Sequence, residues 1–229
     1  MNSHRVDVAI SAVALTVFGL VVLAIVWSGD WAYQGLANLN GVTGTTFRST
    51  LTNPPAEIPV DLGALLRWHR RWATYVIGVG AVPEGLGTFD ADEYAHMDDV
   101  RNVFRGAQFA AGLAFIVVVF RLNRARSFER GLRLARDSAV VAAAIVAVIG
   151  VAAAVAFEPL FLLFHDVFFP QGNFLFDPAT SNLIRLYPEW YWEGITAGVG
   201  ASFIALALLC AALSHAVLRR RATTYTRAA

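Results

Sequence analysis

Four long runs without a charged residue constrain this chain more than any other feature. They cover residues 8–29, 106–120, 138–157 and 194–214, and are 22, 15, 20 and 21 residues long. A helix needs about 20 apolar residues to cross the hydrocarbon core of a bilayer. Hydrophobic residues make up 57% of the chain and charged residues only 15%, which excludes a disordered chain. We therefore expect an all-α, polytopic membrane protein with four transmembrane helices.

The charged residues are distributed unevenly between the segments that separate these runs. Residues 1–7, 121–137 and 215–229 hold 11 arginines against three acids, whereas residues 28–105 and 158–193 hold 7 arginines against 14 acids. Short arginine-rich segments next to membrane spans stay in the cytoplasm. We therefore expect a multi-pass protein whose N and C termini are cytoplasmic and whose acidic segments, with any chemical site, face outward.

The boundaries of a single membrane domain follow from these patterns. The first span is too long for the apolar part of a signal peptide and no small-x-small cleavage pattern follows it, so we expect a retained anchor. The expected segments are a first span over about 8–29, an outer segment with an interfacial helix over 30–90, a second span with projecting turns over about 91–122, an inner loop over 123–136, a third span over about 137–165, an outer loop over 166–188, a fourth span over about 189–217 and a cytoplasmic tail over 218–229.

An amphipathic helix is predicted in the long outer segment, after loop-like sequence that includes Asn53-Pro54-Pro55. Asp61 is a suitable N-cap, and apolar residues recur at helical spacing from Leu62 to Ile77 with arginines opposite them. This pattern is typical of a helix that lies in the membrane interface. His69 falls within the apolar stripe. A packed histidine is the simpler interpretation of this residue, and a role in a site is the alternative.

The second span begins with a strong start signal. Asp90 and Glu93 have the spacing of a capping box, and Phe89 and Tyr94 have that of a hydrophobic staple. Nothing breaks the helical pattern over 91–122. A helix of that length is about 48 Å long, so its first turns project beyond the lipid.

Two histidines are expected at the same depth near the outer surface. His96 lies 25 residues from Arg121, and His165 lies 28 residues from Asp137, which are about 38 and 42 Å along helices that flank one inner loop. A kink at Pro159 would shorten the second distance. We therefore expect the two histidines to approach one another across a polar pocket that opens outward.

Acidic residues accompany both histidines. Asp99 shares a helical face with His96, and Glu158 lies seven residues before His165 on the same face near the membrane boundary. Beyond His165, an aromatic-rich segment predicts a lid or reentrant loop, and Asp177-Pro178 predicts the start of a short helix that ends at Leu186.

Several motifs together carry a resemblance to a known family. They are the block Phe89 to Val100, which ends in His96-Met97-Asp98-Asp99-Val100, the pair Phe164-His165, the run Phe174 to Pro178, the pair Leu183-Ile184 and the run Pro188 to Trp192. In these motifs the chain resembles the four-span bacterial integral membrane family that includes the lipoprotein intramolecular transacylase, Lit. The family usually has Trp where Phe174 stands and an acid where Ser181 stands, and either departure could mark a relative with a different substrate.

The resemblance implies an acyltransferase of the bacterial plasma membrane. Its partners would be a diacylglyceryl-modified lipoprotein and membrane lipid, with no nucleic acid and no cofactor. An acyl chain would move from glycerol to the α-amine of the N-terminal cysteine and give a lyso-form. His96 and His165 are the candidate catalytic pair that the resemblance implies.

The residues themselves fit a reaction without a protein nucleophile. No Gly-x-Ser-x-Gly motif is present, and Cys210 lies toward the inner half of the fourth span. The amine of the substrate would then attack, with His96 as the base, Asp99 or Asp98 orienting its ring, and His165 stabilising the oxyanion or protonating the departing oxygen. The residues expected to bind substrate or support the pair are Asp98, Glu158, Asp166, Asp177 and Arg185.

Two other classes of function remain open from the sequence. A metal site could form from His96, Asp99 and His165 with Asp166 or Glu158, although no Cys/His spacing resembles a zinc motif. A non-catalytic protein that binds lipid or a partner is the other alternative, in which acids and aromatic residues only furnish the interface.

The charge distribution predicts the topology directly. Reporter fusions after Arg126 and after Ala229 should both report the cytoplasm, because the segments that hold these positions carry most of the arginines. Labelling of an Arg126→Cys variant by a membrane-impermeant thiol reagent added outside intact cells would contradict this topology.

Overall fold

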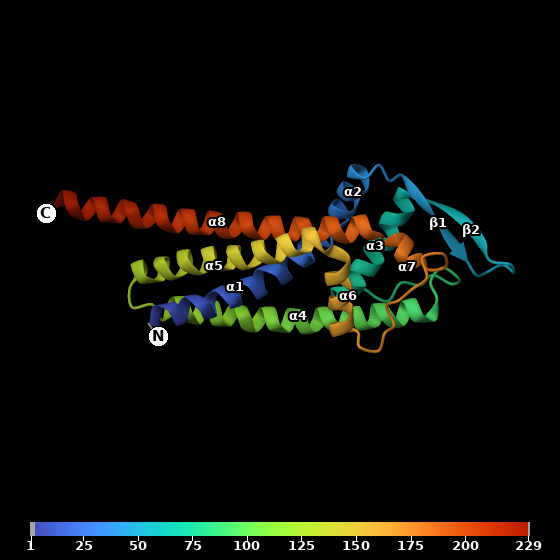
Figure 1. Ribbon diagram of the computed structural model, residues 1–229, viewed down its shortest axis with the longest axis horizontal. Helices are drawn as coiled ribbons and strands as arrows, with labels where there is room; N and C mark the ends of the chain where they lie inside the picture. Colours follow the sequence, from blue (N-terminus) through green and yellow to red (C-terminus); the bar gives the residue numbers. More distant parts are fainter. Residues whose placement is uncertain (1–2, 229) are drawn as a thin grey trace. The chain divides into compact units, whose positions relative to one another are not determined.

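The computed structural model describes the backbone of residues 3–228 and the side chains of residues 4–221. Within that range the chain divides into two compact units, one made of residues up to 23, 108–155 and from 197 onward, the other of residues 24–107 and 156–196. The elements are α1 (Ser3–Trp27), α2 (Asp30–Leu39), β1 (Gly44–Ser49), β2 (Ala56–Asp61), α3 (Leu62–Val76), α4 (Ala91–Asn123), α5 (Phe128–Val155), α6 (Phe157–Phe168), α7 (Asn182–Leu186) and α8 (Glu189–Ala228) (Figure 1).

Within the described residues, four helices are long and apolar enough to cross a membrane. They are His4–Trp27, Ala91–Asn123, Phe128–Val155 and Glu189–Arg221. The predicted all-α membrane fold with four spans is therefore confirmed.

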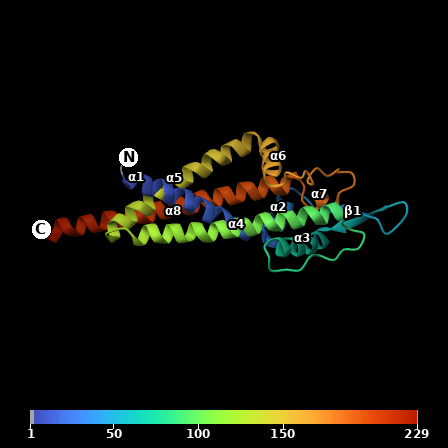
Figure 2. The same cartoon turned by 90° about the horizontal axis from the view of Figure 1, so that it is seen from below.

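The first unit packs its helices through small residues. Ala12 of α1 and Ala139 and Ala142 of α5 are fully buried, and they lie in one cluster with Phe203 and Ala207 of α8. Small side chains allow helix backbones to approach closely, which replaces the hydrophobic effect as the source of packing energy in lipid. Figure 2 shows α1 and α5 crossing at an angle, and the buried cluster places both in contact with α8.

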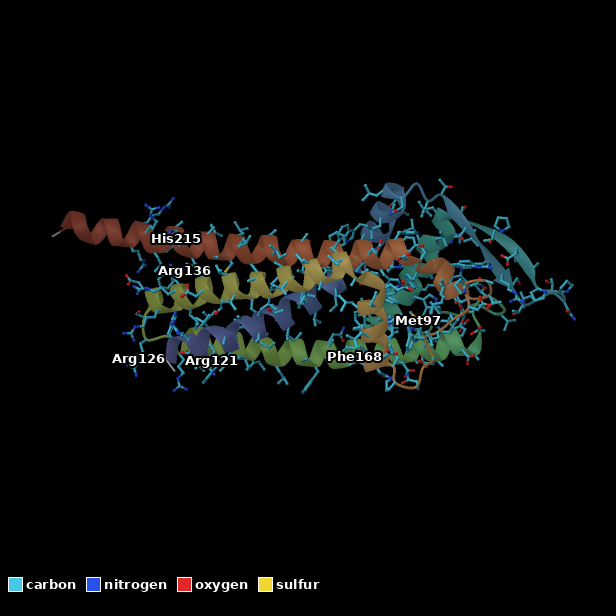
Figure 3. The ribbon with its side chains drawn as sticks, viewed as in Figure 1. Met97, Arg121, Arg126, Arg136, Phe168 and His215 are labelled. Atoms are coloured by element: carbon cyan, nitrogen blue, oxygen red, sulfur yellow. The ribbon has the colours of Figure 1, made fainter. Side chains whose placement is uncertain are left out.

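Ion pairs hold the arginine-rich end of the same unit. Arg121 pairs with Asp7, and Asp137 accepts from Arg136 at 2.8 Å and contacts the His4 ring at 3.1 Å. Figure 3 labels Arg121 and Arg136 in this region. The connection between α4 and α5 is only residues 124–127, so the inner loop expected over 123–136 is mostly helix.

The third span differs from the expectation. We predicted one kinked helix over about 137–165, but α5 ends at Val155 and α6 begins at Phe157 after a non-helical Ala156. Pro159 lies in the first turn of α6, where its missing N–H costs no hydrogen bond. His165 therefore belongs to a separate helix of the second unit.

The second unit contains a β-hairpin that the sequence did not predict. β1 and β2 pair antiparallel, with Phe47 opposite Ile58 and Arg48 opposite Glu57. The Asn53-Pro54-Pro55 sequence, correctly assigned to a loop, lies in the connection between them. Pro59 interrupts the pattern of the second strand, which weakens its signal in the sequence.

The predicted amphipathic helix is present as α3, and it lies at the centre of the second unit. The Asp61 side chain caps it by accepting from the Ala64 N–H at 2.6 Å. Its apolar face is buried rather than resting on open surface, with Leu65 1% and Trp72 0% exposed. This face packs in one cluster with residues of α2, β1, α4, α7 and α8.

The capping box of α4 is confirmed and does more than cap. Asp90 accepts from the Glu93 N–H at 2.8 Å, and the Asp90 N–H donates to Glu93 Oε2 at 2.9 Å. The other oxygen, Oε1, accepts from Ser181 Oγ and from the Leu183 N–H, both at 2.6 Å. One buried carboxylate therefore ties the start of α4 to the start of α7.

The predicted start of the last short helix was wrong. We expected Asp177 to cap a helix through Leu186, but α7 begins at Asn182 and is capped by Ser181. Asp177 accepts instead from the Ala179 N–H at 2.9 Å within a turn. The Ser181 hydroxyl is the better cap here because it also donates to Glu93.

We predict that Glu93→Gln destabilises the second unit, whereas Asp92→Asn does not. The Glu93 carboxylate accepts from three donors, the Asp90 N–H, the Ser181 hydroxyl and the Leu183 N–H. An amide retains only one acceptor oxygen, so at least one of these donors loses its partner, at a cost of about 1 to 3 kcal/mol. Asp92 is the exposed neighbour on the same turn. Thermal unfolding of both variants in one detergent measures the difference, and equal midpoints would contradict the structural role of Glu93.

Candidate functional site

The two predicted histidines meet in the second unit. His96 comes from the second turn of α4 and His165 from the last turn of α6. Their ring centroids are 6.0 Å apart and the rings are nearly parallel, at 21°. The expected approach of the two imidazoles is therefore confirmed, and both side chains are buried, with 7% and 9% exposed.

Phenylalanine rings make the aromatic walls around the pair. Phe169 lies 4.9 Å from His96 and 5.3 Å from His165 between ring centroids. Phe161 lies 4.2 Å and Phe174 lies 5.0 Å from His165, and Phe176 lies 5.6 Å from His96. These walls are apolar and aromatic, so the polar pocket expected from the sequence is not what lines the pair.

A hydrogen bond sets the tautomer of His165. Its Nδ1 lies 2.7 Å from the Phe161 carbonyl oxygen, an atom that can only accept, so Nδ1 carries the proton. Nε2 is then an available lone pair. Burial lowers the pKa of His165, while Asp166 acts in the opposite direction, so the ring is neutral at pH 7 and competent as a base.

His96 has a different environment. Its Nδ1 is buried without a hydrogen-bond partner in the protein, which is uncommon for a buried nitrogen. The side chain of Asn173 lies beside the imidazole. It donates from Nδ2 to Asp99 at 2.7 Å, so the Asp99 carboxylate is bound to the amide that lies beside His96.

Asp98 does not orient His96, contrary to one of the two roles expected for these acids. Its carboxylate accepts from the Tyr75 hydroxyl of α3. The Arg101 guanidinium lies 4.3 Å from the centroid of the same tyrosine ring. The chain can place only one of two adjacent carboxylates on the His96 side of α4, and that one is Asp99.

The remaining predicted site residues lie outside the pair. Glu158 and Asp166 are exposed on α6, and Asp177 belongs to the turn described above. Arg185 pairs with Glu57 of β2 at 2.5 and 3.1 Å and donates to the Thr46 carbonyl of β1 at 3.2 Å. Its contacts are those of a residue that fastens α7 to the hairpin.

His69 is a packed histidine, as the simpler interpretation held. It is 1% exposed; its Nε2 donates to the Ser28 carbonyl at 3.0 Å and its Nδ1 lies 3.3 Å from the Tyr187 hydroxyl. Tyr33 packs against the ring at a tilt of 31°, and Tyr191 meets it edge-on at 67°. Burial lowers the pKa of His69 to about 4.

No group of three or more His, Cys, Asp or Glu residues among the described side chains is arranged to hold a metal ion.

Two residues of the site, Gln171 and Asn173, were not predicted from the sequence. Both donate to Asp99 at 2.7 Å. Their one local signal was a turn sequence that brings two amide side chains close together.

Comparisons with known proteins support the resemblance. Residues 80–192 match the model of the family described as lipoprotein intramolecular transacylase Lit. The integral membrane Lit from Bacillus cereus has a solved structure that matches with a TM-score of 0.70 at 16% identity, over 96% of this chain and 98% of that one. A substituted variant of the same protein matches with a TM-score of 0.65 at 17% identity, over 97% and 95% of the two chains.

No curated protein sequence matches the chain. The resemblance that the sequence motifs predicted is confirmed, and at such low identity the structural likeness is one of fold. The fold is that of an integral membrane protein whose relatives are acyltransferases.

We predict that acid destabilises the second unit through His69. Its pKa is about 4 when folded, against an ordinary value of 6.5, so the unfolded chain binds more protons between these values. Stability should therefore fall as the pH is lowered from about 6.5 to about 4, by up to about 3 kcal/mol from this group. Denaturation in detergent across this range measures the slope. His69→Gln should flatten it, whereas substitution of the exposed His215 should leave it unchanged, and an unchanged slope in the His69 variant would refute the assignment.

Proposed function

We propose that this protein, which resembles the Lit family, transfers an acyl chain within a diacylglyceryl lipoprotein. The chain would move from the glycerol ester to the α-amine of the N-terminal cysteine, and the product would be a lyso-form lipoprotein. The observation that carries this proposal is the buried pair of imidazoles, His96 and His165, with ring centroids 6.0 Å apart in a phenylalanine-lined site.

The residues around the pair suit an acyl transfer in which the substrate supplies the nucleophile. The rings in contact with either histidine are phenylalanines, and the one cysteine of the chain, Cys210, is exposed on α8 in the other unit. Acyl chains would contact the phenylalanines by burial of apolar surface. The amine and the ester belong to one molecule, so holding both supplies much of the acceleration through proximity.

The proposed reaction balances without a cofactor. The amine nitrogen attacks the ester carbonyl carbon, forms the C–N bond and gives a tetrahedral intermediate with a negatively charged oxygen. The C–O bond to glycerol then breaks. One proton leaves the nitrogen and one is added to the glycerol oxygen, so the base that takes the proton can return it. The product is an amide and a free glycerol hydroxyl.

The hydrogen bonds support a division of labour between the histidines. His165 is neutral, and its Nδ1 proton is held by the Phe161 carbonyl, so its free Nε2 is suited to remove the amine proton. This reverses the roles that we assigned from the sequence. His96 presents a buried Nδ1 without a protein partner, and it is suited to contact the carbonyl or leaving oxygen.

The orientation of the site completes the proposal. The excess of arginine in 121–137 and of acids in 28–105 and 158–193 supports cytoplasmic termini and a site that faces outward in the bacterial plasma membrane. Substrate lipoproteins are anchored at that same outer surface, where their modified N-terminal cysteine lies at the interface.

A non-catalytic lipid-binding protein is the second candidate, because phenylalanine walls alone would also hold acyl chains. The buried, unpartnered Nδ1 of His96 favours the enzyme. An apolar lipid site gains nothing from an orphaned polar atom, whose burial costs about 1 to 3 kcal/mol.

We predict that His96→Ala and His165→Ala each lower the rate of acyl transfer by about 10²- to 10⁴-fold. Cys210→Ala, the matched control, should leave it unchanged because that thiol lies in the other unit. Tandem mass spectrometry of the N-terminal peptide of a lipoprotein, from cells with equal amounts of each variant in the membrane, measures the fraction that is N-acylated. Normal N-acylation in both histidine variants would favour the lipid-binding alternative.

A further inference from the structure

The histidine pair is too well covered to receive a diacylglyceryl group as it stands. His96 is 7% exposed and His165 is 9% exposed. A substrate with two acyl chains cannot place an ester carbonyl against either ring unless part of the cover moves. Part of the second unit must therefore move to admit the substrate.

The segment between α6 and α7 supplies most of the cover. Residues 169–176, which we call the lid, contain no regular helix or strand. Phe169 and Phe174 contact the His165 ring, and Phe169 and Phe176 contact the His96 ring. Gly172, at the tip, has a φ of 76° that other residues rarely adopt. The lid is thus a loop that contains a glycine at its tip and whose phenylalanine side chains contact the two imidazole rings.

A single carboxylate oxygen fastens the tip of the lid to α4. Asp99 Oδ2 accepts from Gln171 Nε2 and from Asn173 Nδ2, both at 2.7 Å, and Gln171 also donates to Asn173 Oδ1 at 3.1 Å. The far end of the segment is held separately, by Ser181 and Leu183 on Glu93. Releasing Asp99 would free the tip while leaving the far end in place.

We propose that residues 169–176 are a lid that opens to admit the acylated cysteine, that Asp99 latches it closed, and that Asn173 is a positioning residue which the closed lid brings against His96. The two amides are not equivalent. Both bind Asp99, but of the two only Asn173 acts on the electrostatic environment of the imidazole. Closure would therefore position His96 at the same time as it excludes water, as lids commonly do. The role of Asn173 rests on the proposed acyl transfer, whereas the latch does not.

The latch has a test that needs no activity. Asp99→Ala and Asp98→Ala remove neighbouring carboxylates, but only Asp99 binds the lid, since Asp98 binds Tyr75. Hydrogen exchange of the purified protein in detergent should be faster in peptides covering 169–176 for Asp99→Ala than for Asp98→Ala. Equal exchange of the lid in these two variants would overturn the latch.

The opening step is tested by a reversible cross-link. In a Cys210→Ala background, Asn102→Cys on α4 and Gln171→Cys on the lid are joined with a thiosulfonate cross-linker that a reductant removes. Both positions are exposed, and Asp99, Asn173 and the histidines stay intact. The matched control joins Thr45→Cys and Val60→Cys, which are opposite each other in the hairpin. Transfer should fall at least about tenfold in the joined lid and recover on reduction, with no change in the control. Full activity of the joined lid would overturn the opening step.

The positioning role is tested by comparing Asn173→Ala with Gln171→Ala. Each variant loses one bond to Asp99, so a purely structural effect would be similar in both. We expect kcat to fall at least about tenfold more in Asn173→Ala, and the pH dependence of kcat to change in that variant alone. Similar kcat values and pH profiles in the two variants would overturn it. If the Cys210→Ala parent transfers no acyl chain to nitrogen, the proposed function fails, and the exchange experiment still decides the latch.

Discussion

The arrangement of the site depends on one stretch of helix, the first three turns of α4. Glu93, His96 and Asp99 follow one another at intervals of three residues, so they lie along neighbouring positions of the same side. Glu93 holds the start of α7 through Ser181 and Leu183, and Asp99 holds the tip of the lid through Gln171 and Asn173. His96 lies between the two anchors. The reactive imidazole thus lies under a segment whose tip and far end are held by carboxylates of the same helix.

The second imidazole is placed by a break in the chain. A continuous third span would carry His165 along the direction of α5, but α5 ends at Val155 and a new helix starts at Phe157. The proline in the first turn of α6 explains why the helix restarts there. Within the second unit, α6 then presents His165 to His96 and its own carbonyl, that of Phe161, to the His165 ring.

Local features of this structure could be predicted from the sequence, and long-range features could not. The four spans follow from hydropathy, the start of α4 from the Asp90–Glu93 capping box, and α3 from its amphipathic period. The meeting of His96 and His165 was expected from helical rise along a continuous third span, and it occurs although that span breaks at Ala156. In contrast, the bonds of Asp99 to Asn173 and of Arg185 to Glu57 join residues 74 and 128 positions apart. Amide and arginine side chains have no periodicity that reveals such partners, so the lid contacts and the ion pair of Arg185 with Glu57 appear only in the fold. The hairpin was missed because Pro59 and a polar, exposed second strand hide the alternation that marks strands.

We propose that a pair of imidazoles moves an acyl chain between two groups of one substrate molecule. The most direct test is a crossover measurement with the purified protein in liposomes. Two synthetic diacylglyceryl-cysteine peptides are mixed, one with deuterated acyl chains and the other with a peptide of different mass, and the products are fragmented by tandem mass spectrometry. We expect N-acylated, monoacylglyceryl isomers with unchanged total mass. Each peptide should retain only its own acyl chains, and His96→Ala should give none of this product. Exchange of labelled chains between the peptides, or the absence of any N-acylated product, would contradict it.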